Sequence, residues 1–214
     1  MSARRVVIVV GAGVIGSADL NGEPHRPYDR PPLSTKLLAG EREPDRVQRR
    51  QPEAFDQLDV SWRFGVAAAG LDVAGRRVHL TDGTDVAFDG CIIATGAACR
   101  RLPEQGRFAH VHELRTLDDA MALRTRLADG GKRVVVSGAG FIGREGAATA
   151  HSLGNSVTVL EGGPAPLIRG LGAEMGLAIA ALHVAAGIDV RCGVQVDRLH
   201  ERGVVLAAST SGDG

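Results

Sequence analysis

Two glycine-rich turns of the same spacing are the residues of this sequence with the most specific chemistry. In each, a run of Val and Ile leads into Gly-x-Gly-x-x-Gly, the order expected of a buried parallel strand, a tight turn and a helix. Such a turn brings the N–H groups of the helix N-terminus to an anion, typically a pyrophosphate. The repeat predicts two dinucleotide-binding units. The glycines are Gly11, Gly13 and Gly16 in the first copy and Gly138, Gly140 and Gly143 in the second.

The second turn has the features of a complete dinucleotide site. Gly138 permits the sharp turn, Gly140 lets the backbone approach a pyrophosphate, and Gly143 allows close packing of the helix on the sheet. Glu161 ends the next predicted strand, 23 residues after Gly138. A carboxylate there accepts hydrogen bonds from ribose hydroxyls and repels the extra phosphate of NADP, so NAD(H) is the predicted ligand. The alternative is a turn that serves packing alone.

The first copy is too short for the same arrangement. Its candidate acid, Glu23, follows Gly11 by only 12 residues. A helix advances about 1.5 Å per residue and a strand about 3.3 Å per residue, so a helix and a returning strand do not both fit. We therefore predict that the helix is at most a stub, and that the neighbouring strand is absent or reduced to Leu20 and Asn21. The strand at residues 6–10 would then be an exposed apolar edge that promotes self-association.

The elements around the two turns predict an α/β fold. Their periodicity indicates two Rossmann-like units with parallel sheets and a β-meander, the first unit being incomplete. Residues 24–34 contain four prolines and are expected to form an extended loop. The predicted domains are residues 1–105 and 106–214. The predicted helices are 52–58, 117–127, 145–153 and 174–186, and the predicted strands lie within 60–83, 91–96, 156–160, 188–192 and 194–208.

Composition and charge exclude several classes of function. Lys plus Arg and Asp plus Glu each total 25, and a net charge of zero argues against a nucleic-acid binder. The three cysteines form no Cys-x-x-Cys pair, which excludes a dithiol redox centre and favours a reducing, cytoplasmic compartment. The seven histidines show no metal-ligand spacing. No apolar stretch reaches the ~18 residues of a membrane span.

Four further segments give the chain a family resemblance. They are Arg26-Pro-Tyr-Asp-Arg-Pro-Pro-Leu-Ser34, Leu38-Ala-Gly40, Ala94-Thr-Gly96 and Leu114-Arg-Thr-Leu-Asp-Asp119. With the two turns, they make the chain resemble, over nearly its whole length, the FAD-dependent NADH:ferredoxin, putidaredoxin and rubredoxin reductases of the pyridine nucleotide-disulfide oxidoreductases. The resemblance implies an FAD-binding domain at 1–105 and an NAD-binding domain at 106–214. It also implies hydride transfer from NADH to FAD and electron transfer to a [2Fe-2S] ferredoxin or a rubredoxin.

The resemblance also assigns cofactor contacts to matching positions. Glu23 would meet the adenosine ribose of FAD, Ala68 would lie in the strand beside its adenine, and Arg115 would contact the flavin cofactor. The positions assigned to FAD are Gly11, Gly13, Ile15, Gly16, Glu23, Arg30, Thr35, Ala68, Thr95, Gly96 and Arg115. The positions assigned to NAD are Gly138, Gly140, Ile142, Gly143 and Glu161.

Glu145 and Lys36 are the candidate catalytic residues. Glu145 matches the family's carboxylate near the stacked nicotinamide and flavin rings, whose usual partner is a Lys directly after Pro-Pro-Leu-Ser. Here that position is Thr35, and Lys36 comes one place later, a rotation of about 100° in a helix. The alternatives are that Glu145 complements the helix dipole and that Lys36 is a solvated surface residue.

Three hypotheses of function stay open at this stage. The sequence stops before the family's returning FAD segment, so it resembles an internally deleted and C-terminally truncated reductase. One alternative is a non-catalytic fragment that binds NAD weakly, and another is a module that only docks a ferredoxin. We expect a cytoplasmic protein, monomeric or weakly self-associating, that binds no metal, nucleic acid or membrane.

Overall fold

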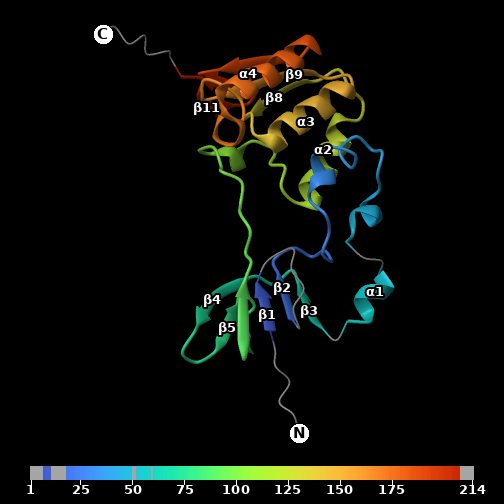
Figure 1. The fold of residues 1–214 in the computed structure, drawn as a ribbon, viewed down its shortest axis with the longest axis vertical. Helices are drawn as coiled ribbons and strands as arrows, with labels where there is room; N and C mark the ends of the chain where they lie inside the picture. Colours follow the sequence, from blue (N-terminus) through green and yellow to red (C-terminus); the bar gives the residue numbers. More distant parts are fainter. Residues whose placement is uncertain (1–6, 11–17, 50–51, 59, 208–214) are drawn as a thin grey trace, which may run out of the picture. The chain divides into compact units, whose positions relative to one another are not determined.

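The computed structural model describes residues 7–10, 18–49, 52–58 and 60–207, which form two compact units (Figure 1). The first unit comprises Met1–Asp29 and Asp45–Ala98, and the second comprises Arg30–Pro44 and Cys99–Gly214. Residues 30–44, which were expected in the first domain, belong instead to the second unit.

A four-stranded parallel sheet organises the first unit. Its strands follow the order β3-β2-β1-β7, and all three pairings are parallel. Parallel pairing of this kind is the arrangement that the apolar run before the first glycine turn predicts. The strands are β1 (Val7–Val10), β2 (Ala18–Asn21), β3 (Ser61–Phe64) and β7 (Gly90–Ile93).

The strand β2 after the first glycine turn is present and is longer than the predicted remnant of Leu20 and Asn21. Its presence also bears on the exposed edge that we predicted at residues 6–10. β2 has four residues and pairs with β3 from Ala18↔Ser61 to Asn21↔Phe64. Because β2 is hydrogen-bonded on both sides, four residues suffice to hold it in the sheet. β1 therefore lies between β2 and β7, so the prediction of an exposed edge at residues 6–10 is wrong. The predicted loss of the helix concerns residues 11–17, which lie outside the described residues.

An antiparallel meander and a short helix complete the first unit. The meander has the order β4-β5-β6, and its buried side chains Val78 and Leu80 alternate as the sequence predicts. The apolar run at residues 91–96 predicts a buried strand, but Ile92 and Ile93 of β7 are exposed, which corrects that prediction. The elements are α1 (Pro52–Asp56), β4 (Ala68–Asp72), β5 (Arg77–Leu80) and β6 (Asp85–Ala87).

The second unit contains a parallel sheet of order β10-β9-β8, alternating with helices as the sequence predicts. An antiparallel hairpin, β11–β12, follows it. The strands are β8 (Arg133–Ser137), β9 (Ser156–Glu161), β10 (Asp189–Cys192), β11 (Val196–His200) and β12 (Gly203–Leu206). The helices are α2 (Leu117–Leu127), α3 (Phe141–Ser152) and α4 (Ile168–Ala185), with short 3-10 helices η1 (Pro31–Ser34) and η3 (Gln105–Arg107). A third 3-10 helix, η2 (Pro44–Val47), begins at the last residue of the 30–44 segment, and its other residues belong to the first unit.

The core of the second unit explains why residues 30–44 belong to it. Leu38 is buried in one cluster with residues of α2, α3, β9 and the turn before β10. Two of the four prolines that predicted an extended loop, Pro31 and Pro32, begin η1 instead, because their fixed φ suits the first positions of a helix. The core residues are Leu38, Leu127, Ala139, Ala147, Ala150, Val157, Val159 and Ile188.

α4 differs from expectation in length and exposure. It begins at Ile168 and joins two helical stretches across Gly172, whose φ is +78°. Its 18 residues have a mean hydropathy of 1.3 and only 6% of them are buried, so by length and composition α4 could cross a membrane. The sequence predicts no apolar stretch of ~18 residues, and α4 contains the charged residues Arg169 and Glu174. One such helix is weak evidence for a membrane span.

The core position of Leu38 gives a stability prediction. Leu38→Ala should lower the free energy of unfolding by about 2–5 kcal/mol, because Leu38 is only 1% exposed and its removal leaves a cavity. Leu182→Ala is the matched control: Leu182 is 70% exposed on α4, so the loss should stay within about 0.5 kcal/mol. Urea denaturation followed by far-UV circular dichroism measures both. Equal small losses would contradict the place of residues 30–44 in this core.

Candidate functional site

In the turn between β8 and α3, Gly143 has no room for a side chain, whereas Gly140 has open space beside it. Gly138 has a φ of +102°, which a residue with a side chain rarely adopts, and its N–H donates to the Leu160 carbonyl at 2.7 Å. A Cβ at Gly143 would lie 2.1 Å from the Gly138 carbonyl oxygen, so only glycine fits there. A Cβ at Gly140 would meet nothing within 4 Å. The backbone can therefore be approached at Gly140, as a pyrophosphate would require.

The N-terminus of α3 is uncapped at this turn. Gly140 is the N-cap residue and has no side chain to accept a hydrogen bond from the first turn of the helix. No acidic residue lies in that first turn. The free N–H groups and the positive end of the helix dipole therefore favour an anion at this position. Ile142 and its neighbour Phe141 are exposed beside it.

Glu161 connects the end of β9 to the turn. One of its carboxylate oxygens, Oε2, accepts a hydrogen bond from the Ala139 N–H at 2.8 Å, and Oε1 accepts one from the Gly163 N–H at 2.9 Å. A carboxylate has about four acceptor positions, so each oxygen can accept a further bond. The side chain is half-buried. The structure thus brings Glu161 to the glycine turn, where the spacing in the sequence predicts it.

Glu145 lies four residues into α3 and contacts η1. Its Oε2 accepts a hydrogen bond from the Ser34 hydroxyl at 2.5 Å. The Thr149 hydroxyl donates to the Ser34 carbonyl at 2.9 Å. Ser34 is 3% exposed and Thr149 9% exposed, so the bond between them is buried, whereas the bond to the half-buried Glu145 is only partly shielded from water. The sequence analysis assigned no role to Ser34 or Thr149; only the i,i+4 spacing of Glu145 and Thr149 shows that these two share a helix face.

The structure does not bring Lys36 to Glu145. Lys36 is exposed, and within the described ranges its side chain forms no ion pair with Glu145. The next two residues, Leu37 and Leu38, are 0% and 1% exposed and occupy the buried side of the segment. Lys36 is thereby directed away from the core. The Thr35 hydroxyl donates locally to the Pro31 carbonyl at 3.3 Å.

The two arginines assigned to FAD lie side by side in the second unit. Arg30 Nη1 donates to the Arg115 carbonyl at 2.6 Å. The Arg115 N–H donates in turn to Asp119 Oδ2 at 3.0 Å. Asp119 also forms the capping box of α2 with Thr116, so Arg115 is held at the start of that helix.

The remaining FAD assignments fall on the first unit. Glu23 lies two residues after β2 and accepts a hydrogen bond from the Tyr28 hydroxyl. This is the carboxyl end of the strand beside β1, the place of a ribose-binding acid in a dinucleotide fold. Ala68 begins β4, and Thr95 and Gly96 follow β7. Four assignments lie outside the described residues: Gly11, Gly13, Ile15 and Gly16.

The cysteines and the possible metal ligands among the described residues show no arrangement typical of a reactive thiol or a metal site. Cys91, Cys99 and Cys192 are free, and burial raises the pKa of each thiol, so none is an activated thiolate. In the part of the chain that the structure describes, no three His, Cys, Asp or Glu side chains gather as metal ligands.

Known proteins resemble this chain in sequence and in fold. A probable ferredoxin reductase of Castellaniella defragrans is 34% identical over 93% of this chain and 52% of its own length. The biphenyl dioxygenase system ferredoxin–NAD(+) reductase component of Paraburkholderia xenovorans is 35% identical over 94% of this chain and 53% of its own length. The chain spans about half the length of these curated relatives.

Solved structures agree with the sequence comparison. A ferredoxin reductase from Rhodopseudomonas palustris superposes with a TM-score of 0.85 at 33% identity, covering 94% of this chain and 55% of that one. The reductase in a covalent putidaredoxin reductase–putidaredoxin complex gives a TM-score of 0.84 at 28% identity, covering 95% and 54%. The sequence model of the pyridine nucleotide-disulphide oxidoreductases matches residues 18–214. With its α/β fold and its glycine turn closed by Glu161, the chain belongs to the pyridine nucleotide-disulphide oxidoreductase family.

Proposed function

We propose that this chain acts as an FAD-dependent oxidoreductase of the ferredoxin-reductase type. It would pass hydride from NADH to FAD and electrons on to an iron–sulfur protein. The observation that supports this most is the open turn at Gly140, with an uncapped helix N-terminus on one side and the Glu161 carboxylate on the other. The named functions of its relatives, ferredoxin reductases of dioxygenase systems, support the same activity.

The second unit has the residues that NAD(H) requires. The pyrophosphate would lie at the N-terminus of α3, against the backbone of Gly140 and beside Ile142. Gly138 and Gly143 give the turn its shape without contributing side chains. The free acceptor positions of Glu161 would take the adenosine ribose hydroxyls, and its negative charge would repel a 2′-phosphate. The unit therefore favours NAD(H) over NADP(H).

Glu145 is the proposed polar contact to the reacting end of the dinucleotide. It lies within the second turn of α3, beyond the glycines that would hold the pyrophosphate. When bound, NADH supplies the hydride and FAD accepts it; the chain contributes position and charge. A half-buried carboxylate with one oxygen already hydrogen-bonded is fixed in direction before any ligand arrives. Lys36 has no place in this proposal, because it is exposed and unpaired with Glu145 in the described structure.

The first unit is the proposed FAD-binding part. Glu23, at the carboxyl end of β2, would accept the adenosine ribose hydroxyls of FAD. Thr95 and Gly96 follow β7 at the same edge of the sheet, and Ala68 begins the neighbouring meander. Arg30, Thr35 and Arg115, which the family resemblance also assigns to FAD, belong to the second unit.

The proposed electron acceptor is a [2Fe-2S] ferredoxin or a rubredoxin. The arginine pairs at 76–77 and 100–101 expose cationic side chains that could meet an acidic partner surface. We propose a cytoplasmic protein that is monomeric or weakly self-associating. An NAD-binding protein without flavin turnover is the second candidate, favoured by the observation that the second unit by itself contains the whole described NAD site.

Flavin content separates these two candidates. The purified chain, freed of unbound flavin, should retain FAD at close to one equivalent and show the absorption bands of bound flavin. FAD is quantified after denaturation, and bleaching by NADH tests the transfer itself. Absence of FAD even after incubation with an excess would leave NAD binding as the function and contradict the reductase proposal.

Two glycine-to-alanine variants test the dinucleotide turn. Gly140→Ala should leave stability unchanged, because its Cβ meets nothing and its φ of −72° suits alanine, yet weaken NADH binding by occupying the ligand's approach. Gly143→Ala should lower the free energy of unfolding by about 1–3 kcal/mol, since its Cβ overlaps the Gly138 carbonyl. NADH titration and urea denaturation give the two readouts. Full NADH affinity in Gly140→Ala would exclude this turn as the site.

Glu161→Gln tests the choice of nucleotide. The variant should bind NADH about tenfold more weakly, because hydrogen bonds to a charged acceptor contribute about 1.5–3 kcal/mol each. It should also lose discrimination against NADPH, since the repelling charge is gone. Glu174→Gln, which removes an exposed carboxylate of α4, is the control. Unchanged preference for NADH over NADPH would place the ribose-binding acid elsewhere.

A further inference from the structure

The contact between η1 and α3 is a polar cluster in which Ser34 and Thr149 are buried and Glu145 is half-buried. Ser34, Glu145 and Thr149 are joined by two hydrogen bonds, of 2.5 Å and 2.9 Å. Residues 111 and 115 positions apart in the sequence meet in this cluster. Buried polar groups of this kind are retained when each is satisfied, and they fix a geometry that apolar packing does not.

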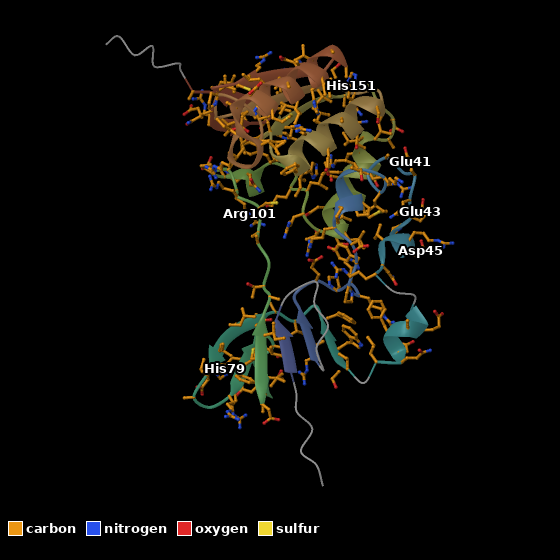
Figure 2. All side chains as sticks on the ribbon, viewed as in Figure 1. Glu41, Glu43, Asp45, His79, Arg101 and His151 are labelled. Carbon is orange, nitrogen blue, oxygen red and sulfur yellow. The ribbon has the colours of Figure 1, made fainter. Side chains whose placement is uncertain are left out.

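The position of the Ser34 hydroxyl is fixed by contacts of Ser34 itself and of the residues before and after it. Thr149 holds the Ser34 carbonyl from the helix, and the buried Leu37 and Leu38 hold the chain that follows. The Arg30 guanidinium anchors the start of η1 to the Arg115 carbonyl. Farther along the same segment, Glu43, which is labelled in Figure 2, forms an ion pair with Arg124 of α2 at 2.8 Å. The Ser34 donor therefore approaches Glu145 from a fixed direction.

Only one oxygen of the Glu145 carboxylate therefore accepts a hydrogen bond from the described residues. Its Oε2 accepts from Ser34, while Oε1 accepts no hydrogen bond from the residues that the structure describes. The neighbouring Arg144 forms no hydrogen bond to it in the described structure: burial lowers the pKa of Arg144, and its Nε and Nη1 are buried without a hydrogen-bond partner among the described residues. A glutamate with one oxygen bound and one free presents a single directed acceptor. The Ser34 bond already restricts the rotation of the Glu145 side chain, so the binding of a ligand loses less conformational entropy.

We propose that Ser34 is a positioning residue for the nicotinamide end of bound NADH. By holding Oε2, it directs Oε1 of Glu145 toward an N–H donor, which we assign to the carboxamide of the nicotinamide ring. Thr149 supports this by fixing the Ser34 carbonyl. The proposal rests on the proposed function, since it presumes that the second unit binds NADH.

Three ligands distinguish a positioning role from a structural one. ADP-ribose has the adenosine, the pyrophosphate and both riboses of NADH but no nicotinamide. The 3-acetylpyridine analogue of NADH keeps the ring and replaces the carboxamide by an acetyl group, which has no N–H. Ser34→Ala should raise the dissociation constant of NADH about three- to tenfold, and should leave those of the other two ligands unchanged. A general loss of folding would weaken all three together.

Variants of Thr149 and Glu145 test the same contact independently of Ser34→Ala. Thr149→Ser retains the hydroxyl and should bind NADH as the unmodified chain does, whereas Thr149→Ala should weaken NADH selectively. Glu145→Gln places an amide where the free carboxylate oxygen was, so it should show the same selective loss even if Ser34→Ala does not fold. In the Glu145→Gln background, Ser34→Ala should add no further loss for NADH, because the two act on one contact.

Each outcome decides between the two proposals. An equal loss for NADH and ADP-ribose, or no loss at all, overturns the role of Ser34 and leaves the NADH site standing. An unmodified chain that binds neither NADH nor ADP-ribose overturns the proposed function, and the role of Ser34 with it. Additive effects of Ser34→Ala and Glu145→Gln overturn the assignment of Ser34 to Glu145.

Discussion

The docking of residues 30–44 onto α2 and α3 is the constraint on which the second unit depends. Leu38 fills the core between the helices and β9, so this segment is part of the unit and not a linker to it. The polar contacts of Arg30 and Ser34 then lock its orientation on the two helices. Because the apolar anchor and the polar contacts lie on one short segment, the position of Glu145 is coupled to the packing of the core.

The glycine turn shows how one backbone geometry supports both folding and binding. At Gly143 the absence of a side chain lets the helix start against the Gly138 carbonyl, which is a requirement of packing. At Gly140 the same absence leaves open space, which is a requirement of a ligand. Glu161 links the two, since its bond to the Ala139 N–H holds the turn while its carboxylate keeps acceptor positions for further hydrogen bonds. The turn is therefore ordered before a dinucleotide binds.

The first unit shows the limit of an argument from chain length. The count of residues after Gly11 leaves no room for a full helix and strand, yet β2 forms with four residues. The count allowed at most a strand reduced to Leu20 and Asn21, and β2 contains these two residues together with Ala18 and Asp19. In the sheet, β1 and β3 supply hydrogen bonds on both sides of β2, and β3 comes from residues 61–64. Pairing with a distant segment, which a local count does not include, decided the outcome.

Features that follow from a repeating pattern of neighbouring residues could be predicted from the sequence alone. Periodicity placed α2 at 117–127 and the β8–α3–β9 order, and spacing placed Glu161 at the glycine turn. The tertiary structure decided the partner of Glu145, the exposure of Lys36 and the unit to which residues 30–44 belong. The physical reason is that a contact such as Ser34 with Glu145 joins residues 111 positions apart. It depends on how η1 and α3 pack, and side-chain packing between distant segments has no period that a sequence can display.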